Sequence, residues 1–563
     1  MNQPQDAQQR IAMRDPAGVM TLACMGSAHR HRLSFMRILL RRLKRENWRF
    51  HRPVWRMDDL GYGVAVYCAE GPQRSYSLVA FSHRLAAEMR TDRVIATAWD
   101  ATFALFDGIP SEADIERLRL NVPKQEAGRV SSRELTVARA NRSVRLFDHV
   151  VARLAEGRQP DAAMVEDVGY LMRTTAVYGS GKLGAADFEM IAGRPEMASP
   201  YQAEMLTVYL IRDFTVDLAE HIAKRSSPAM AVVMESQLRR SFGVGNATGL
   251  GMAPYLVNHP VVLNQWVWVR EAALVRVRSL PQTQPAIAAT FQSLVQRAKL
   301  GVAAWHTDDA IQTARIAGLT QDLERLSRHL EAAALDGSLP WDRLYRWAAA
   351  NLTLEGREFL VALMLEPHDA LVDDLEQAYH ADEFASFRID GSRTIATAVA
   401  LIEWNYAWAL KIDFDDCDEQ ARFWYTSAEK LEPRLGERWR EPGAELEQPL
   451  GVARDIQLLH RDLLASQPST GLAEFLLGHP EHRHTVRRSQ IGEHHPYAEI
   501  CDNVIGAAMR PIDFLRFKLA FFGASRFDPR SDRWVRITMF QHAPFARDLA
   551  VSVADDWFLP PLQ

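Results

Sequence analysis

Cysteine is scarce in this chain, and the few that occur lie far apart. The sequence contains Cys24, Cys68, Cys417 and Cys501, with no CxxC pair among them. Small disulfide-stabilised secreted domains and cysteine-based zinc sites both need closely spaced cysteines. The scarcity argues against both classes and is typical of a reducing compartment, so we expect a cytoplasmic protein.

Long apolar runs are missing too. No stretch approaches the roughly 18 apolar residues that a membrane-spanning helix requires, and residues 1–18 contain no apolar segment of the secretory-signal kind. The net charge of −5 does not indicate a molecule that binds polyanions over its whole surface. We therefore expect no membrane span, and we do not expect nucleic acid as the main partner.

Complete motifs for cofactor binding or catalysis are also missing. No dinucleotide fingerprint, P-loop, metal-ligand signature or nucleophile motif is complete in the sequence, which therefore identifies no cofactor and no reaction. The composition itself, 47% hydrophobic and 24% charged residues, is that of a globular protein. With 563 residues the chain is long enough for two or more domains.

The apolar periodicity predicts a mainly α protein of the α+β class, with a bundle-like helical body and a small antiparallel β-sheet from the N-terminal region. Strand-like runs occur within residues 60–108, and the segment 533–540 (RWVRITMF) is expected to return to the same sheet. Helical spacing predicts the following helices: 111–119, 132–157, 260–275 and a run over 284–366.

Composition divides the chain into four parts. Residues 1–20 form a loose or disordered arm, and residues 21–130 form an α+β region with a cationic helix and the small sheet. Residues 131–431 form a mainly helical central domain with glycine loops. Residues 432–563 form a C-terminal helical region with a histidine-rich segment and a final strand. The last boundary is set by the polar residues 432–450, which contain three prolines.

Residues 27–56 carry ten Lys or Arg side chains against the single acid Glu46. Apolar residues recur at helical spacing, which predicts a cationic amphipathic helix: Leu33, Met36, Leu40 and Leu43. Such a helix can contact nucleic acid or an anionic membrane. The interpretation we favour is a surface helix with solvated or ion-paired arginines, because the whole molecule is acidic.

Glycines concentrate after residues 228–241, which themselves look helical. Gly243, Gly245, Gly249 and Gly251 permit positive φ and a close backbone approach to an anion. The corner Asn258-His259-Pro260 then places His259 at the N-terminus of a helix, where the helix dipole disfavours an imidazolium. A neutral histidine there is a candidate acid or base. From this stretch we assign His259 and Tyr255 as catalytic residues and the following as substrate-binding: Gly245, Asn246, Gly249 and Asn258.

A second glycine segment follows a predicted helix over residues 163–173. Gly179, Gly181 and Gly184 enclose Lys182, although the spacing is not that of a P-loop. Arg173, Gly181 and Lys182 are therefore predicted to hold a carboxylate or phosphate. The alternative is a simple connection between two helices with a solvated lysine.

Histidines cluster in residues 478–503. His495-Pro496 repeats the His259-Pro260 corner and is predicted to open another helix, which makes His494 and His495 further catalytic candidates. Arg483, Arg487 and Arg488 lie among the histidines in sequence, and cations disfavour a nearby metal. We therefore expect no bound metal.

Together these patterns predict a cytoplasmic enzyme that acts on a small anionic metabolite, a carboxylate or phosphate, by histidine acid/base chemistry. The two glycine segments are expected to face one pocket that contains Arg173, Lys182 and His259. Two alternatives stay open: a protein that associates with nucleic acid or anionic membranes through residues 29–56, and a helical scaffold without a small-molecule site. A homo-oligomer is compatible with all three.

Overall fold

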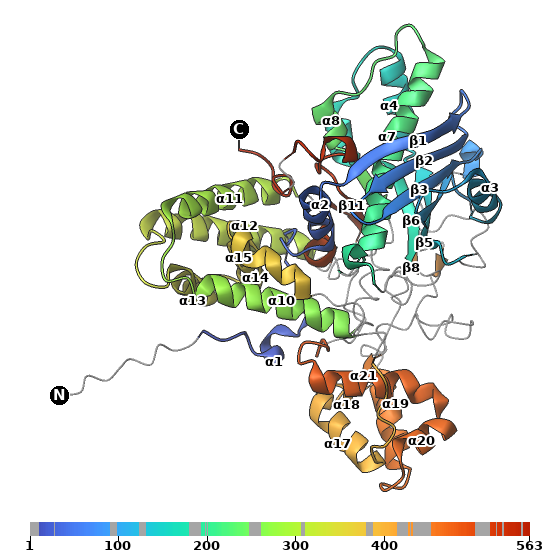
Figure 1. The fold of residues 1–563 in the computed structure, drawn as a ribbon. Coiled ribbons are helices and arrows are strands. Elements are labelled where there is room, and N and C mark those ends of the chain that lie inside the picture. Colours follow the sequence, from blue (N-terminus) through green and yellow to red (C-terminus); the bar gives the residue numbers. More distant parts are fainter. Residues whose placement is uncertain are drawn as a thin grey trace.

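The computed structural model combines a large β-sheet, a layer of long helices beside it and a smaller helical unit (Figure 1). The described residues are 11–27, 29–89, 98–122, 131–179, 193–197, 199, 201–246, 260–305, 310–378, 387–413, 426–427, 430–431, 452–501, 518–524, 526–531, 534–552 and 555–562. Among the helices in these ranges, none is long and apolar enough to cross a bilayer.

The sheet has nine strands in the order β1-β2-β3-β4-β5-β6-β7-β11-β10. Strands β1 to β6 form an antiparallel meander, β7 pairs with β6 in parallel, and β11 is antiparallel to both β7 and β10. The strand bounds are β1 Arg49–Met57, β2 Gly63–Glu70, β3 Ser75–Ser82, β4 Ala101–Asp107, β5 Glu134–Arg142, β6 Tyr170–Gly179, β7 Gly243–Asn246, β10 Arg526–Ser531 and β11 Trp534–Met539.

Both faces of the sheet are buried. On β2, Ala65 and Tyr67 belong to the main core, while Val66 and Cys68 belong to a second core on the other face. The main-core face is covered by the long helix α7 (Gln202–Ser226), whose Phe214 ring lies against Phe103 of β4. The other face is covered by α3 (Glu112–Asn121). Burial on two sides explains why β2, β3 and β4 are mainly apolar, whereas the edge strand β1 is polar and largely exposed.

The predicted fold class is wrong, because the sheet is neither small, nor wholly antiparallel, nor confined to the N-terminal region. Strand β5 occupies the first part of the predicted helix 132–157, and only α4 (Phe147–Ala155) is helical there. The predicted helix 163–173 ends as α5 (Ala162–Val168) at Gly169, whose φ of 74° is left-handed, and β6 follows. The predicted return of residues 533–540 to the sheet is confirmed by β11.

The long helices form a layer beside the sheet. The helices predicted at 111–119 and 260–275 and the run over 284–366 are confirmed. The bounds in this layer are α10 Pro260–Arg278, α11 Pro285–Ala303, α12 Ala310–Ala332, α13 Pro340–Asn351, α14 Leu354–Leu365, α15 Asp369–Val372 and η4 Asp373–Ala378. Trp266 of α10 is fully buried and donates its indole N–H to Leu33 O, which ties this layer to the N-terminal segment.

Residues 27–56 do not form one surface helix. Helix α2 spans Phe35–Arg45, and β1 begins at Arg49. In Figure 1 α2 lies between the helical layer and the sheet, and its side chains are buried from Phe35 to Leu43, including Arg37. The predicted helix over 228–241 is likewise reduced to α8 (Ser236–Arg240).

The smaller helical unit has its own core, which includes Ile402, Tyr406, Ile456 and Leu459. Its helices are α17 Ile395–Asn405, α18 Ala407–Leu410, α19 Val452–Leu464, α20 Leu472–Gly478, η7 Pro480–His482 and α21 Arg483–His494. The helix predicted to open at His495-Pro496 is absent from the described residues, because α21 ends at His494 and turns follow.

The remaining short elements are α1 Pro16–Val19, η1 Leu22–Cys24, η2 Ala87–Met89, η3 Pro195–Met197, β8 Thr426–Ser427, β9 Lys430–Leu431, the π-helical η9 Lys518–Phe522 and η10 Ala546–Asp548. The four-part division of the chain stays a prediction.

Candidate functional site

Three of the predicted substrate-binding residues lie together at the β6–β7 pair. Arg173 of β6 is opposite Gly245 of β7, and Thr174 is opposite Asn246. Because β6 and β7 are parallel, both chain segments that follow them start from the same edge of the sheet. The carboxyl ends of adjacent parallel strands are a common location for ligand sites in open sheets.

Packing accounts for the glycine in this pair. A Cβ atom on Gly245 would lie 2.7 Å from the Tyr170 ring, so a larger residue does not fit. Arg173 is buried, with 3% of its surface exposed. The other predicted residues of these segments lie outside the described residues: Gly181, Lys182, Gly249, Tyr255, Asn258 and His259. The shared pocket therefore stays a prediction.

The two predicted catalytic histidines of the C-terminal region sit at the wrong end of a helix. His494 is the last residue of α21 and His495 is its C-cap. A helix C-terminus favours an imidazolium, whereas the prediction required an N-terminus that disfavours one. His494 Nε2 lies 3.6 Å from Glu493, and the His495 ring nitrogen Nδ1 lies 3.2 Å from the Asn264 amide nitrogen.

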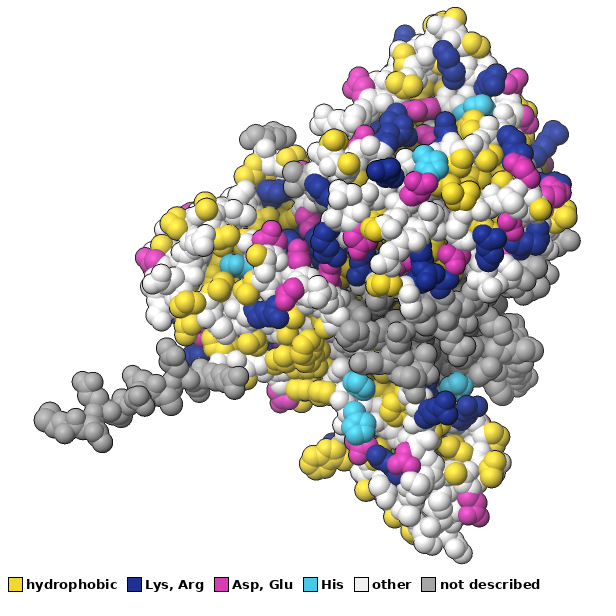
Figure 2. All heavy atoms as spheres, viewed as in Figure 1, with side chains coloured by type: hydrophobic (Ala, Val, Ile, Leu, Met, Phe, Trp, Pro, Cys, Tyr) yellow, Lys and Arg dark blue, Asp and Glu magenta, His cyan; other side chains and the backbone are white. Residues whose placement is uncertain are grey.

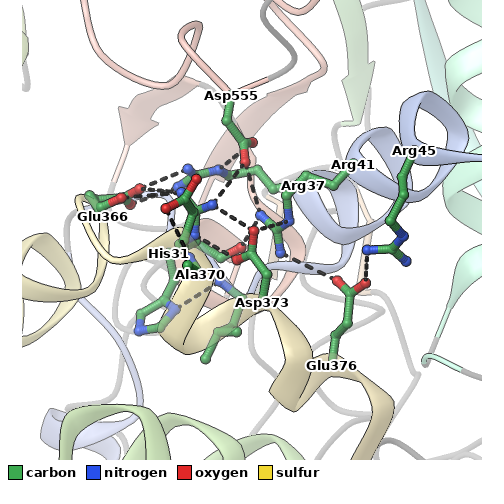
Figure 3. A network of polar contacts seen from close by, with 12 residues as sticks. His31, Arg37, Arg41, Arg45, Glu366, Ala370, Asp373, Glu376 and Asp555 are labelled. Atoms are coloured by element: carbon green, nitrogen blue, oxygen red, sulfur yellow. Dashed lines mark hydrogen bonds and ion pairs between the residues drawn. The ribbon is translucent and has the colours of Figure 1, made fainter. Parts of the chain in front are cut away.

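The arginines of α2 enter a buried ionic network rather than a surface (Figure 3). The Arg37 guanidinium donates to both oxygens of Glu366 at 2.7 Å, and its Nε donates to Asp555 at 3.2 Å. Arg41 lies 3.2 Å from Asp555, and Arg45 lies 2.8 Å from Glu376. Each of these positive charges thus faces a carboxylate from a distant part of the chain.

Contacts within the network shift the pKa values of its ionisable groups. Burial raises the pKa of Glu366, but the charge of Arg37 and the hydrogen bond from His29 outweigh that effect and hold this pKa below its usual range. Burial lowers the pKa of His29, although Glu366 opposes the shift. These are the properties of a structural ion-pair cluster, in which the charges compensate one another.

A cavity of about 490 Å³ lies elsewhere, between the edge of the sheet and α7. Its walls come from β1, β2, α7 and η10. The lining residues are Phe50, His51, Arg52, Trp55, Tyr67, Cys68, Leu210, Asp213, Asp217, Glu220, His221, Lys224, Ala546 and Arg547. The volume lies within the range of small-molecule sites.

Helix α7 supplies two carboxyl groups to the cavity, one helical turn apart. Residues four apart share one face of a helix, so Asp213 and Asp217 both line the cavity. Asp217 accepts hydrogen bonds from Arg52 at 2.7 Å, Arg547 at 2.7 Å and the Tyr67 hydroxyl at 2.8 Å. Asp217 is therefore held in place by partners from β1, η10 and β2.

Asp213 has the opposite environment. It is 4% exposed, and within the described part of the chain its buried Oδ2 has no hydrogen-bond partner. Burial, together with the negative charge of Asp217, raises the pKa of Asp213 to about 7, although Arg547 and Arg212 oppose the shift. A carboxyl group whose pKa is raised towards neutrality beside an ion-paired carboxylate is an arrangement that acid/base catalysis uses.

The ring of His221, which also lines the cavity, is fixed by hydrogen bonds at both of its nitrogen atoms. The Trp55 indole N–H donates to its Nδ1 at 3.2 Å, and its Nε2 donates to the Asp58 carbonyl oxygen at 2.8 Å. A carbonyl oxygen can only accept, so the proton of the ring is on Nε2. Both ring nitrogens are engaged, which leaves His221 as a wall residue and Asp213 as the group that can exchange a proton.

The cavity is lined by three cationic side chains and by three carboxyl groups, of which Asp213 has the raised pKa. The cations are Arg52, Lys224 and Arg547, while Glu220 is paired with Arg239, which is outside the lining, at 2.6 Å. Figure 2 shows charged side chains of both signs interspersed over the face of the molecule seen there. The cavity lining is likewise of mixed sign, and two of its cations, Arg52 and Arg547, are paired with Asp217.

The sequence prediction missed this site, although one signal was present. Asp213, Asp217 and His221 recur at intervals of four within an otherwise apolar helical stretch, which places them on one face. The partners Arg52 and Arg547 come from segments far away in sequence, so their arrival needed the fold. Comparison with family models, curated proteins and solved structures finds no match to this chain.

Proposed function

We propose that the protein is an enzyme that binds a small anionic molecule in the α7 cavity and transfers a proton through Asp213. The carrying observation is the pair Asp213 and Asp217, a buried carboxyl group with a pKa of about 7 beside an ion-paired carboxylate. A group with a pKa near the working pH is present in both protonation states, which suits a general acid or base. Histidine catalysis, as predicted from the sequence, is thereby replaced by carboxyl catalysis in this proposal.

The cations Arg52, Lys224 and Arg547 in the cavity lining support an anionic substrate, either a carboxylate or a phosphate. Arg52 and Arg547 each donate to Asp217 through one nitrogen atom, and a guanidinium has five N–H donors. Each arginine therefore has donors left for a second acceptor. Binding of an anion there places it next to Asp213, one turn along α7.

Binding is tested by a thermal-shift screen of small carboxylates and phosphates at low ionic strength, since a ligand of the native state raises its melting temperature. Ligands of the cavity are expected to lose their effect in Arg547→Gln and to keep it in the control Asp167→Asn, which alters an exposed carboxylate of α5. Ligands that shift all three proteins equally contradict the proposal.

Catalysis is tested on any compound found in that screen. Asp213→Asn is expected to lower turnover by roughly a hundredfold or more if the carboxyl group is the general acid or base. The fold should be retained, because asparagine matches the shape of the neutral carboxylic acid. Unchanged turnover in Asp213→Asn sinks the assignment of Asp213.

The β6–β7 edge carries a second candidate site for the same class of ligand. The favouring observation is the parallel register that sets Arg173 opposite Gly245, because it starts both predicted glycine segments from one edge of the sheet. Lys182→Ala is then expected to weaken anion binding and His259→Ala to lower turnover. If both variants behave as wild type while Arg547→Gln does not, the α7 cavity is the site.

The nucleic-acid or membrane alternative receives no support from α2, whose Arg37, Arg41 and Arg42 are buried. The scaffold alternative predicts that no small anion binds at all, so the screen separates it from the proposed enzyme.

A further inference from the structure

Four potential metal ligands meet in the smaller helical unit, in a place that the α7 cavity does not involve. Asp462 comes from α19, His479 follows α20, and Glu481 and His482 form part of η7. One nitrogen or oxygen atom of each residue lies within 4.8 Å of those of the other three. Asp462 precedes the other three residues by seventeen or more positions in the sequence. The packing of α19 against the turn therefore creates the cluster.

Local structure holds the two imidazoles in place. Helix α20 ends at Gly478, and Pro480 directs the chain into the short turn η7. The Phe475 ring stacks on His479 at 4.7 Å between centroids and on His482 at 5.9 Å. The His482 side chain is 7% exposed, and its Nε2 lies 2.8 Å from Asp462 Oδ2. The orientation of both rings is therefore set before any ligand binds.

The arginines that are close in sequence do not fill the cluster. Arg488 pairs with Glu499, at 2.6 Å for one of the two contacts, and Arg483 is exposed. Arg461 takes the other oxygen of Asp462, Oδ1, at 2.9 Å and is itself exposed. Asp462 Oδ2 thus faces His482 with no arginine contact among those described. The expectation of no metal rested on Arg483, Arg487 and Arg488; of these, Arg488 is paired with Glu499 and Arg487 lies over the Phe387 ring.

We propose that Asp462, His479, Glu481 and His482 bind one divalent transition-metal ion, with Zn²⁺ as the reference ion. Imidazole nitrogens and carboxylate oxygens are ordinary ligands of this class. Two ligands of a tetrahedral zinc ion at 2.1 Å lie about 3.4 Å apart, so small side-chain rotations convert the observed spacing into a coordination sphere. The exposed side chains of His479 and Glu481, 41% and 60%, leave an entry path for the ion.

The bound ion connects α19 to the turn between α20 and α21. The ion would take the place of the direct contact between His482 and Asp462. The competing explanation is that the cluster is a plain ion pair that binds no metal. The two explanations differ in one measurable property, because only a metal site adds native-state stability when Zn²⁺ is supplied.

The test uses the full chain after removal of metals with a chelator. Titration with Zn²⁺ in competition with a chromophoric chelator is expected to show one site per chain, and titration with Co²⁺ is expected to give visible d–d absorption. Zn²⁺ should also raise the melting temperature. Mg²⁺ should do neither, because imidazole is a poor ligand for it.

The variants are His479→Ala and Asp462→Asn, with His494→Ala as the control because His494 is an exposed histidine of the neighbouring helix α21. His479 is used in place of His482 because a half-exposed side chain can be removed without opening the core. Both ligand variants should weaken Zn²⁺ binding at least tenfold, which is about the smallest effect expected for a lost ligand, whereas the control binds as wild type. No saturable site in the wild type, or equal affinity in all variants, overturns the proposal.

Discussion

Arg37 carries a full charge in the interior of the protein. Its side chain is 0% exposed, its guanidinium is paired with Glu366 and Asp555, and it lies 4.0 Å from the Phe558 ring centroid. Such a pair adds little net stability compared with apolar packing, but the loss of one partner leaves the other charge buried and uncompensated. An arginine is therefore needed at position 37 chiefly because it neutralises the buried Glu366 carboxylate.

Arg37→Ala is expected to destabilise the protein by about 3–5 kcal/mol, the range for breaking a buried pair. Arg119→Ala is the control, because Arg119 and its partner Glu116 are both exposed, at 55% and 56%. Its effect should be much smaller, because exposed ion pairs contribute little to stability. The free energies of unfolding come from urea denaturation, and similar values for the two variants contradict the structural role of Arg37.

Asp213 gives a pH dependence of known sign. Its pKa rises from an ordinary value of 3.8 to about 7 on folding, so between these values the folded state holds a proton that the unfolded state has released. The stability linked to this proton is fully present below pH 3.8 and is lost as the pH rises towards 7. The slope cannot exceed about 1.4 kcal/mol per pH unit for one proton.

Asp213→Asn removes this titration while it preserves the shape of the neutral acid. The stability difference, wild type minus variant, is therefore expected to fall as the pH is raised from about 4 to about 7. Urea denaturation at several pH values measures it. A difference that does not change with pH shows that Asp213 is not the protonated group.

At the scale of the element, the boundary between α5 and β6 shows what the sequence could and could not provide. Gly169 ends the helix in a left-handed conformation, and a glycine at this position is a recognisable stop signal. Apolar residues 170–172 continue without alternation, however, because β6 lies inside a sheet buried on both faces, and such a run is compatible with a helix as well. Strands β2 and β3 were predicted correctly because turn residues bound them on both sides.

Gly169→Ala is expected to destabilise the protein by about 1–2 kcal/mol, since φ is positive there and L-residues pay for that conformation. A Cβ atom would also lie 3.0 Å from the Gln541 side chain. Gly318→Ala is the matched control, because Gly318 lies within α12 and nothing lies within 4 Å of an added Cβ atom. It should stabilise the protein by about 0.5–1 kcal/mol. Changes of the same sign in both variants argue against this interpretation.

At the scale of the whole molecule, partly or fully buried histidines contribute to the change of stability between neutral and acid pH. Burial lowers the pKa of five described histidines, one of them, His368, to about 4. Each of these histidines binds a proton more readily in the unfolded protein. Each therefore lowers the stability of the folded state as the pH falls below 6.5. Asp213 and Asp455, whose pKa values burial raises to about 7 and about 6, act in the opposite direction.

Because the histidines outnumber these two carboxyl groups, stability is expected to decrease as the pH falls from about 6.5 to about 4.5. Melting temperatures in non-metal-binding buffers measure the decrease. His368→Gln should make the curve shallower, because it removes the histidine whose pKa burial lowers to about 4. A melting temperature that rises over this interval contradicts the expectation.

The candidate sites were predictable only in part, and the reason is distance along the chain. The sequence placed Arg173 and Gly245 in one site, and β6–β7 pairing does bring them opposite each other. It could not indicate that Arg547 would join Asp217, or that Asp462 would join His479 and His482, because periodicity reports the face of an element and not its neighbour. Ion pairing of the α2 arginines was one of the expectations, but their burial was missed for the same reason, since the carboxylate partners of Arg37 lie more than 300 positions away.

That separation has a consequence for the order of events during synthesis. Arg37 and Asp555 are 518 positions apart, and a ribosome that adds roughly 5–20 residues per second needs about 30–100 s to cover that interval. Throughout this time α2 exists without Asp555 and, for most of it, without Glu366. We therefore expect ribosome-bound chains that end before residue 555 to be cleaved by protease near α2, whereas the released protein is protected there. Protection of α2 in the shorter chains, with neither carboxylate yet made, contradicts this order.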